Sequence, residues 1–142
     1  MPAAARRLIV EITETAAIAE PRRFGKLLEA IRTEGTRVAI DDFGSGHTSL
    51  RHLRELPIDL LKLDGTFTQN LQRSTDDRFY VRTLIDLARH LRVDTVAEWV
   101  DDELQATVLR DWGVTYLQGH LFGAAQLVAQ PGAASETGRL AS

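Results

Sequence analysis

The chain has 142 residues, of which 44% are hydrophobic and 26% charged, a balance that is ordinary for one globular domain with a buried core. It contains no cysteine, which excludes disulfides and thiolate metal sites, so we expect a reducing, cytoplasmic location and oxygen or imidazole ligands for any metal. The formal net charge is only -3 and the basic residues form no run, so a surface for polymeric nucleic acid is not indicated. No apolar run is long enough to span a bilayer, and residues 1–7 lack the apolar core of a signal peptide.

Strand and helix patterns alternate along the chain. Residues 7–13, "RLIVEIT", predict a strand, and a helix follows over about 21–34, where apolar residues recur at helical spacing and Gly35 marks the stop. The remaining predicted strands are 36–41, 58–64, 93–99 and 114–120, and the remaining predicted helices are 50–56, 76–91 and 101–112. Apolar strands separated by helices indicate an α/β domain with a parallel sheet. We assign this domain to residues 1–128 and expect 129–142, which are small and polar, to be a disordered tail.

Two adjacent carboxylates stand where the second strand gives way to a glycine loop, in "VAIDDFGSGHTSL". Successive strand residues point to opposite faces, so Asp41 and Asp42 could not share a task within a regular strand. If the strand ends at Asp41 and the backbone turns at Asp42, both carboxylates reach the same place. Gly44 and Gly46 would permit such a turn.

Each predicted strand ends in a polar residue that its apolar neighbours do not explain. These residues are Glu11, Asp41, Lys62 with Asp64, Glu98, and Gln118. A solvated strand end is the ordinary explanation for any one of them. Taken together they favour a shared site, because residues from several strand ends converge at the carboxyl rim of parallel α/β folds.

Four carboxylates at one rim would repel one another unless cations neutralised them, and Glu11, Asp41, Asp42 and Glu98 therefore predict a metal site. Mg²⁺ and Mn²⁺ prefer oxygen ligands, and a bridging carboxylate such as Asp41 can hold two ions about 4 Å apart. Such a pair assists displacement at phosphorus, which indicates phosphoester hydrolysis. Lys62, one of only two lysines, interrupts the apolar run "LLKL" and suits a phosphate oxygen or a nucleophilic water; the alternative is an ion pair with Asp64.

The motifs "EITET", "DDFGSGHTSL", "LLKLD", "VAEWV" and "LQGHLFG", in this order, resemble the EAL domain family of cyclic-di-GMP phosphodiesterases. The resemblance covers about residues 8–125 and implies a two-metal (β/α)8 barrel that linearises cyclic-di-GMP to 5'-pGpG. It implies metal ligation by Glu11, Asp41 and Asp42, with Glu98 as a ligand or general base. It further implies that Lys62 orients the water or the phosphate.

The same resemblance gives three residues supporting roles. Glu14 matches the family glutamate that holds the glycine loop in its working conformation. Gln118 matches a glutamine near the metal waters. Asp101 stands where the family has a second glutamate, one methylene longer, which implies a contact of Asp101 with substrate or a metal water.

The chain also departs from the family pattern. The Glu-Ala-Leu motif, whose glutamate is a metal ligand, and an asparagine ligand on the following strand are both absent. We therefore expect a partial barrel of about five βα units out of eight. Trp99 replaces the glycine of the family's A-E-G-V-E motif, where its ring would crowd the site or cover it.

Three hypotheses follow. In the first, the chain is the C-terminal portion of a phosphodiesterase that works when a second copy or an upstream segment supplies the missing strands. In the second, it is a degenerate, inactive module that binds cyclic-di-GMP or a protein partner in bacterial signalling. In the third, it is a remnant that dimerises through its open edges, which are a known association hazard.

Overall fold

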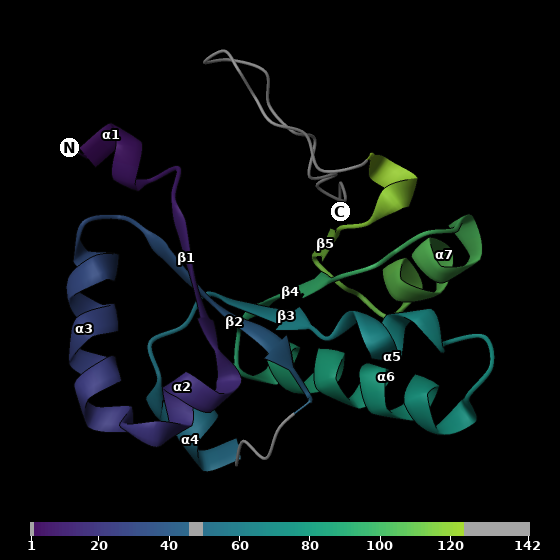
Figure 1. Ribbon diagram of the computed structural model, residues 1–142, viewed down its shortest axis with the longest axis horizontal. Helices are drawn as coiled ribbons and strands as arrows, with labels where there is room; N and C mark the ends of the chain where they lie inside the picture. The colour runs from purple at the N-terminus through teal and green to yellow at the C-terminus, as the bar shows by residue number, and fades with distance from the viewer. Residues whose placement is uncertain (1, 46–49, 124–142) are drawn as a thin grey trace.

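Five parallel strands form one sheet in sequential order, β1-β2-β3-β4-β5 (Figure 1). The computed structural model describes residues 2–45 and 50–123. The strands are β1 (Ile9–Thr13), β2 (Arg37–Phe43), β3 (Leu60–Leu63), β4 (Asp94–Ala97) and β5 (Tyr116–Leu117). Parallel strands in sequential order, with helices between them, are the wall of a (β/α)8 barrel, so the predicted fold class is confirmed. The predicted tail at 129–142 and the loop residue Gly46 lie outside the described residues.

Helices connect successive strands and line the left, lower and right-hand sides of the sheet in Figure 1. They are α2 (Glu14–Ala19), α3 (Pro21–Thr33), α4 (Leu50–Glu55), α5 (Gly65–Gln69), α6 (Thr75–His90) and α7 (Glu103–Asp111). The short helix α1 (Pro2–Ala5) precedes β1, and the 3-10 turn η1 (His120–Phe122) follows β5. The predicted helices at 21–34, 50–56, 76–91 and 101–112 are confirmed within a few residues at each end. No helix among the described segments has both the length and the apolar character that crossing a membrane would take.

Local sequence signals set the ends of the long helices. The Ser74 hydroxyl accepts a hydrogen bond from the Asp77 amide at 3.1 Å and so begins α6, whose first turn is acidic. Helix α3 begins with Pro21 and is followed by Gly35, whose φ of +91° is a conformation that glycine adopts at little cost.

Two short helices were not predicted. Helix α2 starts directly after β1, where the Thr13 hydroxyl accepts from the Ala16 amide at 3.2 Å. Helix α5 starts directly after β3, where the Asp64 carboxylate accepts from the Thr66 amide at 2.9 Å. Each has only five or six residues, too few for a helical repeat to show in the sequence.

The two faces of the sheet are covered differently. One face packs against the helices and forms the main core, which includes the fully buried Leu28, Ile40, Leu61, Ile85 and Leu109. The opposite face carries only a small apolar cluster, Ala39, Leu60 and Val96 with Tyr116 beside it. Alternation of side chains along each strand separates these two sets.

Both edges of the sheet are open within the described residues. Strand β1 pairs only with β2, and β5 pairs only with β4. Leu8 and Ile9, at the β1 edge, are 57% and 43% exposed. The sheet is therefore an arc of a barrel wall whose inner face is uncovered by the described chain.

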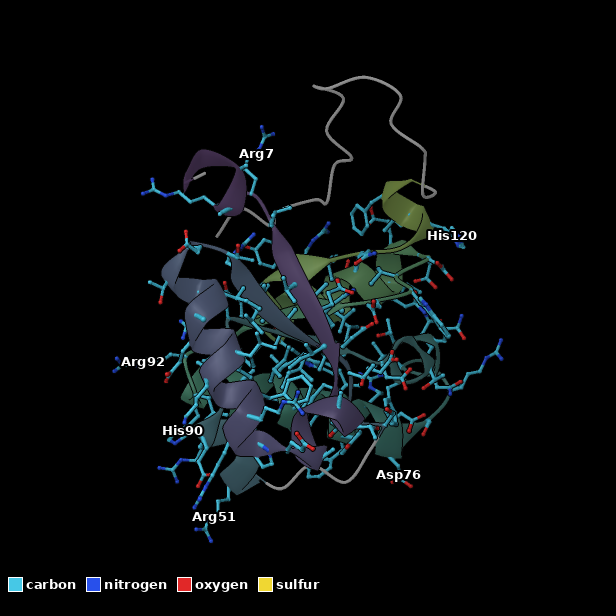
Figure 2. All side chains as sticks on the ribbon, turned by 60° about the vertical axis from the view of Figure 1, so that its left-hand side comes forward. Arg7, Arg51, Asp76, His90, Arg92 and His120 are labelled. Carbon is cyan, nitrogen blue, oxygen red and sulfur yellow. The ribbon has the colours of Figure 1, made fainter. Side chains whose placement is uncertain are left out.

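Charged side chains at the periphery point away from the fold. Figure 2 shows Arg51, Asp76, His90 and Arg92 projecting from the outer surface, and His120 is also exposed. Of the four histidines, the side chains of His90 and His120 are described, and both are exposed. The side chains of His47 and His52 lie outside the described set.

Candidate functional site

Lys62 lies at the centre of the carboxyl rim, on the middle strand β3. Its side chain is only 9% exposed, and its Nζ lies 2.8 Å from Glu11 Oε1, 2.9 Å from Glu98 Oε1 and 3.8 Å from Asp41 Oδ1. Glu11 comes from β1, Asp41 from β2, and Glu98 follows β4. The structure therefore brings together three of the acidic residues predicted from separate strands. Within the described chain, Lys62 forms ion pairs with these three residues and not with Asp64, which was the alternative partner.

The lysine is held in its charged form. Burial alone would lower the pKa of Lys62, but hydrogen bonds to Glu11 and Glu98, together with the charges of Glu98 and Asp41, outweigh it and raise the pKa above its ordinary value. The ammonium is thus a fixed positive charge among the carboxylates.

Three carboxylates meet beside this single lysine, so the negative charges outnumber the positive one. Asp41, Asp42 and Glu98 can each offer one oxygen such that all three oxygens lie within 4.8 Å of one another. Burial raises the pKa of Asp42, and the charges of Asp41 and Asp64 raise it further. Burial also raises the pKa of Glu98, against the opposing effect of Lys62. We call Asp41, Asp42 and Glu98 the acidic cluster; Glu11 joins it through Lys62.

A β-bulge brings Asp41 and Asp42 to the same place. Ile40 pairs with Leu61 and Phe43 with Leu63, so β2 holds one residue more than β3 over this interval. Asp42 takes up the extra length with a φ of +52°, and its amide donates to Asp41 Oδ1 at 2.9 Å. The prediction that the strand ends at Asp41 is wrong, because β2 resumes its pairing at Phe43; the predicted turn at Asp42 is present as a bulge.

A second bulge shapes the neighbouring rim at Glu98 and Trp99. The Gln118 amide donates to the Ala97 carbonyl at 2.9 Å, and the Gln118 carbonyl accepts from the Val100 amide at 3.0 Å. A regular parallel ladder would join that carbonyl to residue 99, so one extra residue is inserted here too. Trp99 absorbs it with a φ of +58°, a left-handed conformation that costs a non-glycine residue about 1–2 kcal/mol. This left-handed backbone explains why the family motif has a glycine at this position.

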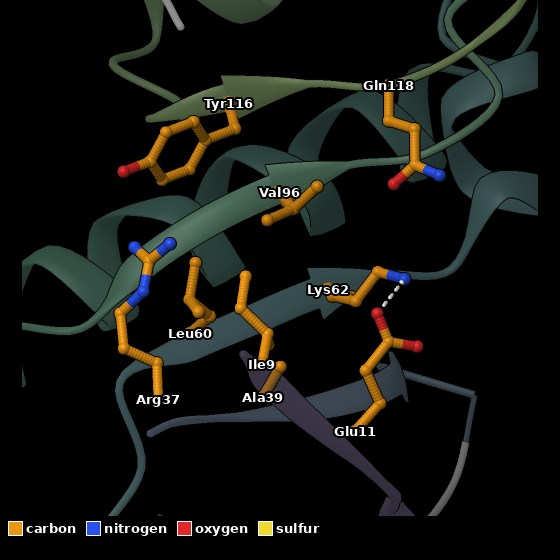
Figure 3. Close-up of a pocket in the computed structure, with 9 residues that line it drawn as sticks. All are labelled: Ile9, Glu11, Arg37, Ala39, Leu60, Lys62, Val96, Tyr116 and Gln118. Atoms are coloured by element: carbon orange, nitrogen blue, oxygen red, sulfur yellow. Dashed lines mark hydrogen bonds and ion pairs between the residues drawn. The ribbon is translucent and has the colours of Figure 1, made fainter. Parts of the chain in front are cut away.

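The rim borders a cavity of about 510 Å³ on the inner face of the sheet. Figure 3 shows Glu11, Lys62 and Gln118 at one end of this cavity and Arg37 and Tyr116 at the other. The floor between them is apolar and is formed by Ile9, Ala39, Leu60 and Val96. The predicted residue Gln118 therefore faces the same cavity as Lys62, while its role toward metal waters stays a prediction.

Glu14 lies outside the acidic cluster. It is the first residue of α2, is buried, and contributes to raising the pKa of Tyr80, for which burial is the larger cause. The Tyr80 hydroxyl donates to the Gly44 carbonyl at 2.9 Å, at the start of the glycine loop. Glu14 thus lies near a contact that fixes the loop entrance, although its role in loop stabilisation stays a prediction. No pattern in the sequence points to Tyr80.

Asp101 also lies outside the acidic cluster. Its Oδ1 accepts from the His120 amide at 3.3 Å and lies 3.3 Å from His120 Nδ1. These contacts tie the segment before α7 to the turn η1. Its predicted contact with substrate or metal water is not among them and stays a prediction.

The comparison with known families agrees with this geometry. The EAL domain model matches residues 2–125. The chain belongs to the EAL domain family. It is 40% identical over 119 residues to the cyclic di-GMP phosphodiesterase PdeB of Shewanella oneidensis, which covers 84% of this chain and 14% of that protein.

Solved EAL structures share the fold. The PaMucR phosphodiesterase, solved as a c-di-GMP complex, has a TM-score of 0.81 at 37% identity, covering 84% of this chain and 49% of that one. Klebsiella pneumoniae BlrP1, solved as a manganese/cy-diGMP complex, has a TM-score of 0.77 at 30% identity, covering 84% of this chain and 31% of that one. The chain thus spans about half of the solved PaMucR chain and a smaller share of the other two proteins.

Proposed function

We propose that this chain forms the metal-binding rim of a phosphodiesterase that hydrolyses cyclic-di-GMP to 5'-pGpG. The observation that carries the proposal is the meeting of Asp41, Asp42 and Glu98 beside a buried, charged Lys62. The names of the relatives support the substrate, because PdeB is a cyclic di-GMP phosphodiesterase and PaMucR was solved with c-di-GMP.

We propose that the residues present contribute ligands to two divalent ions, Mg²⁺ or Mn²⁺. All members of the acidic cluster offer carboxylate oxygens, the donors that these hard cations prefer. Burial is the main cause that raises the pKa of Asp42 and of Glu98, and neighbouring carboxylates raise each pKa further; a bound cation would stabilise the charged form of both groups. In our proposal Asp41, Asp42 and Glu11 would hold the ions, and Glu11 would give up its contact with Lys62 to do so. Bound ions would supply Lewis-acid polarisation of the phosphate and a more acidic water.

Two protein groups have further tasks in this proposal. Lys62, once its carboxylate partners turn to the ions, directs its ammonium to a phosphate oxygen or to the attacking water. Glu98, half-buried and with a raised pKa, is suited to accept the proton of that water at a carboxylate oxygen. The water then attacks one phosphorus and the bond from that phosphorus to a 3' oxygen breaks. The 3' oxygen takes up a proton from solvent, which leaves a linear product with a 5' phosphate and a 3' hydroxyl.

The open inner face requires a cover before substrate can be enclosed. We propose that strands from an upstream segment, or from a second copy of the chain, pair with the free edges of β1 and β5. Exposed Leu8 and Ile9 at the β1 edge support this, because such strands would bury them. The same strands would supply the ligands that the EAL and asparagine motifs provide in the family.

A hydrolysis assay tests the proposal. The purified chain, alone and mixed with the N-terminal half of an EAL barrel, is incubated with cyclic-di-GMP and Mn²⁺, and 5'-pGpG is quantified by chromatography. We expect turnover that requires both Mn²⁺ and Lys62, with Lys26→Met as the matched control because Lys26 is the second lysine and is exposed on α3. Absence of turnover in both preparations would overturn the proposal.

A further inference from the structure

Trp99 is an aromatic residue placed at the rim at an energetic cost. It follows Glu98 directly, has a φ of +58°, and remains 48% exposed. A bulky side chain in a left-handed conformation is rare, and such residues cluster where function requires them. An exposed indole at this point calls for an explanation beyond packing.

The ring lies over the start of α5. A Cβ built on Gly65 would fall 2.2 Å from Trp99 Cδ2 and 2.3 Å from Cγ, so the indole covers a position that only glycine can occupy without displacing it. The β3–β4 register brings the two residues together, because Leu63 pairs with Ala97 and the chains continue side by side. Gly65 follows Asp64, whose charge acts on Asp42. Trp99 is thus the residue next to Glu98 of the acidic cluster, its ring contacts Gly65, and the residue as a whole is 48% exposed.

We infer that Trp99 is a specificity-determining residue of this site, whose exposed indole stacks on a guanine base of a nucleotide when the phosphate lies at the acidic cluster. Indole rings are effective stacking partners for bases, and the nucleotide here is the one in the proposed function, on which this inference rests. Contact of one part of the ring with Gly65 fixes its orientation, so little side-chain freedom is lost when a base stacks on the remainder.

The second tryptophan allows a direct optical test. Trp112 is half-buried beside the main core and lies 6.0 Å from the Arg78 guanidinium, away from the acidic cluster. In a Trp112→Phe chain, the fluorescence then reports on Trp99 alone. Cyclic-di-GMP is titrated with Ca²⁺, an oxygen-seeking cation, and the affinity is measured in parallel by calorimetry.

Matched variants separate stacking from backbone effects. Trp99→Phe and Trp99→Leu both keep a Cβ at the strained position, but only phenylalanine keeps a ring. We expect nucleotide to quench Trp99 in the presence of Ca²⁺ and not with EDTA. We further expect Trp99→Phe to bind within about threefold of the parent and Trp99→Leu to bind about tenfold more weakly. Gly65→Ala, which displaces the ring without removing it, should weaken binding in the same direction.

The outcomes distinguish this inference from the proposed function. Calcium-dependent nucleotide binding that leaves Trp99 fluorescence unchanged, or that is equally tight in Trp99→Leu, overturns the stacking role and leaves the hydrolytic proposal standing. Equal quenching with EDTA also overturns it, since the base would then bind independently of the acidic cluster. Absence of nucleotide binding in every variant and with either cation, Ca²⁺ or Mn²⁺, counts against both.

Discussion

Leu61 and Lys62 are neighbours on β3, yet they belong to opposite faces of the sheet with different physical tasks. Leu61 is fully buried in the core between sheet and helices. Lys62 points to the inner face, where its ammonium contacts Glu11 and Glu98 beside an open cavity. The helix-facing side buries apolar surface within the chain and holds the fold together. The inner face instead gathers charged side chains around Lys62, and in our proposal this is where metal and substrate bind.

Removing Leu61 should produce the largest loss of stability. Leu61→Ala would leave a cavity in a close-packed core and lower the free energy of unfolding by about 3 kcal/mol. Urea denaturation followed by circular dichroism measures it. Affinity for Mn²⁺ should change little, because the side chain lies on the other face; a strong loss of metal affinity in folded Leu61→Ala would contradict the separation of the two faces.

Removing Lys62 should have an intermediate effect that depends on metal. Lys62→Met leaves the surrounding carboxylates without their cation, and we expect the free energy of unfolding in EDTA to fall by about 2 kcal/mol, less than for a fully buried pair because Glu11 is half-exposed. Added Mn²⁺ should restore part of the loss by replacing the missing charge. Lys26→Met is the control, with no measurable change expected in EDTA. If Mn²⁺ restores none of the free energy of unfolding lost in Lys62→Met, the lysine serves packing alone.

The bulge at Asp42 should give the smallest effect, and with the opposite sign. Asp42→Gly removes both a strained φ and a like charge, so we expect a gain of about 1 kcal/mol in EDTA together with weaker Mn²⁺ binding. Asp42→Ala removes the charge but keeps the Cβ, and its gain should be smaller. If the glycine variant is no more stable than the alanine variant in thermal or urea unfolding, the backbone at Asp42 is not strained.

Periodicity and strand-end chemistry predicted the five strands, the long helices and the convergence of Asp41, Lys62 and Glu98. These signals are local or follow from the parallel arrangement, and so they can be read from sequence. The bulges could not be predicted in the same way, because the extra residue in β2 and after β4 shows only against the partner strand. For residue 99, the one sign of a left-handed backbone was that the family motif has a glycine where this chain has Trp99. That sign came from the family pattern and not from the chain's own residues.

Calorimetric titration of the chain with Mn²⁺ tests the central claim most directly. The acidic cluster should bind the ion, Asp41→Asn should weaken binding at least tenfold, and Asp86→Asn, a neutralisation on the outer surface of α6, should leave it unchanged. Parent and Asp41→Asn chains with the same affinity, or a parent that releases no heat of binding in the millimolar range, would contradict the account.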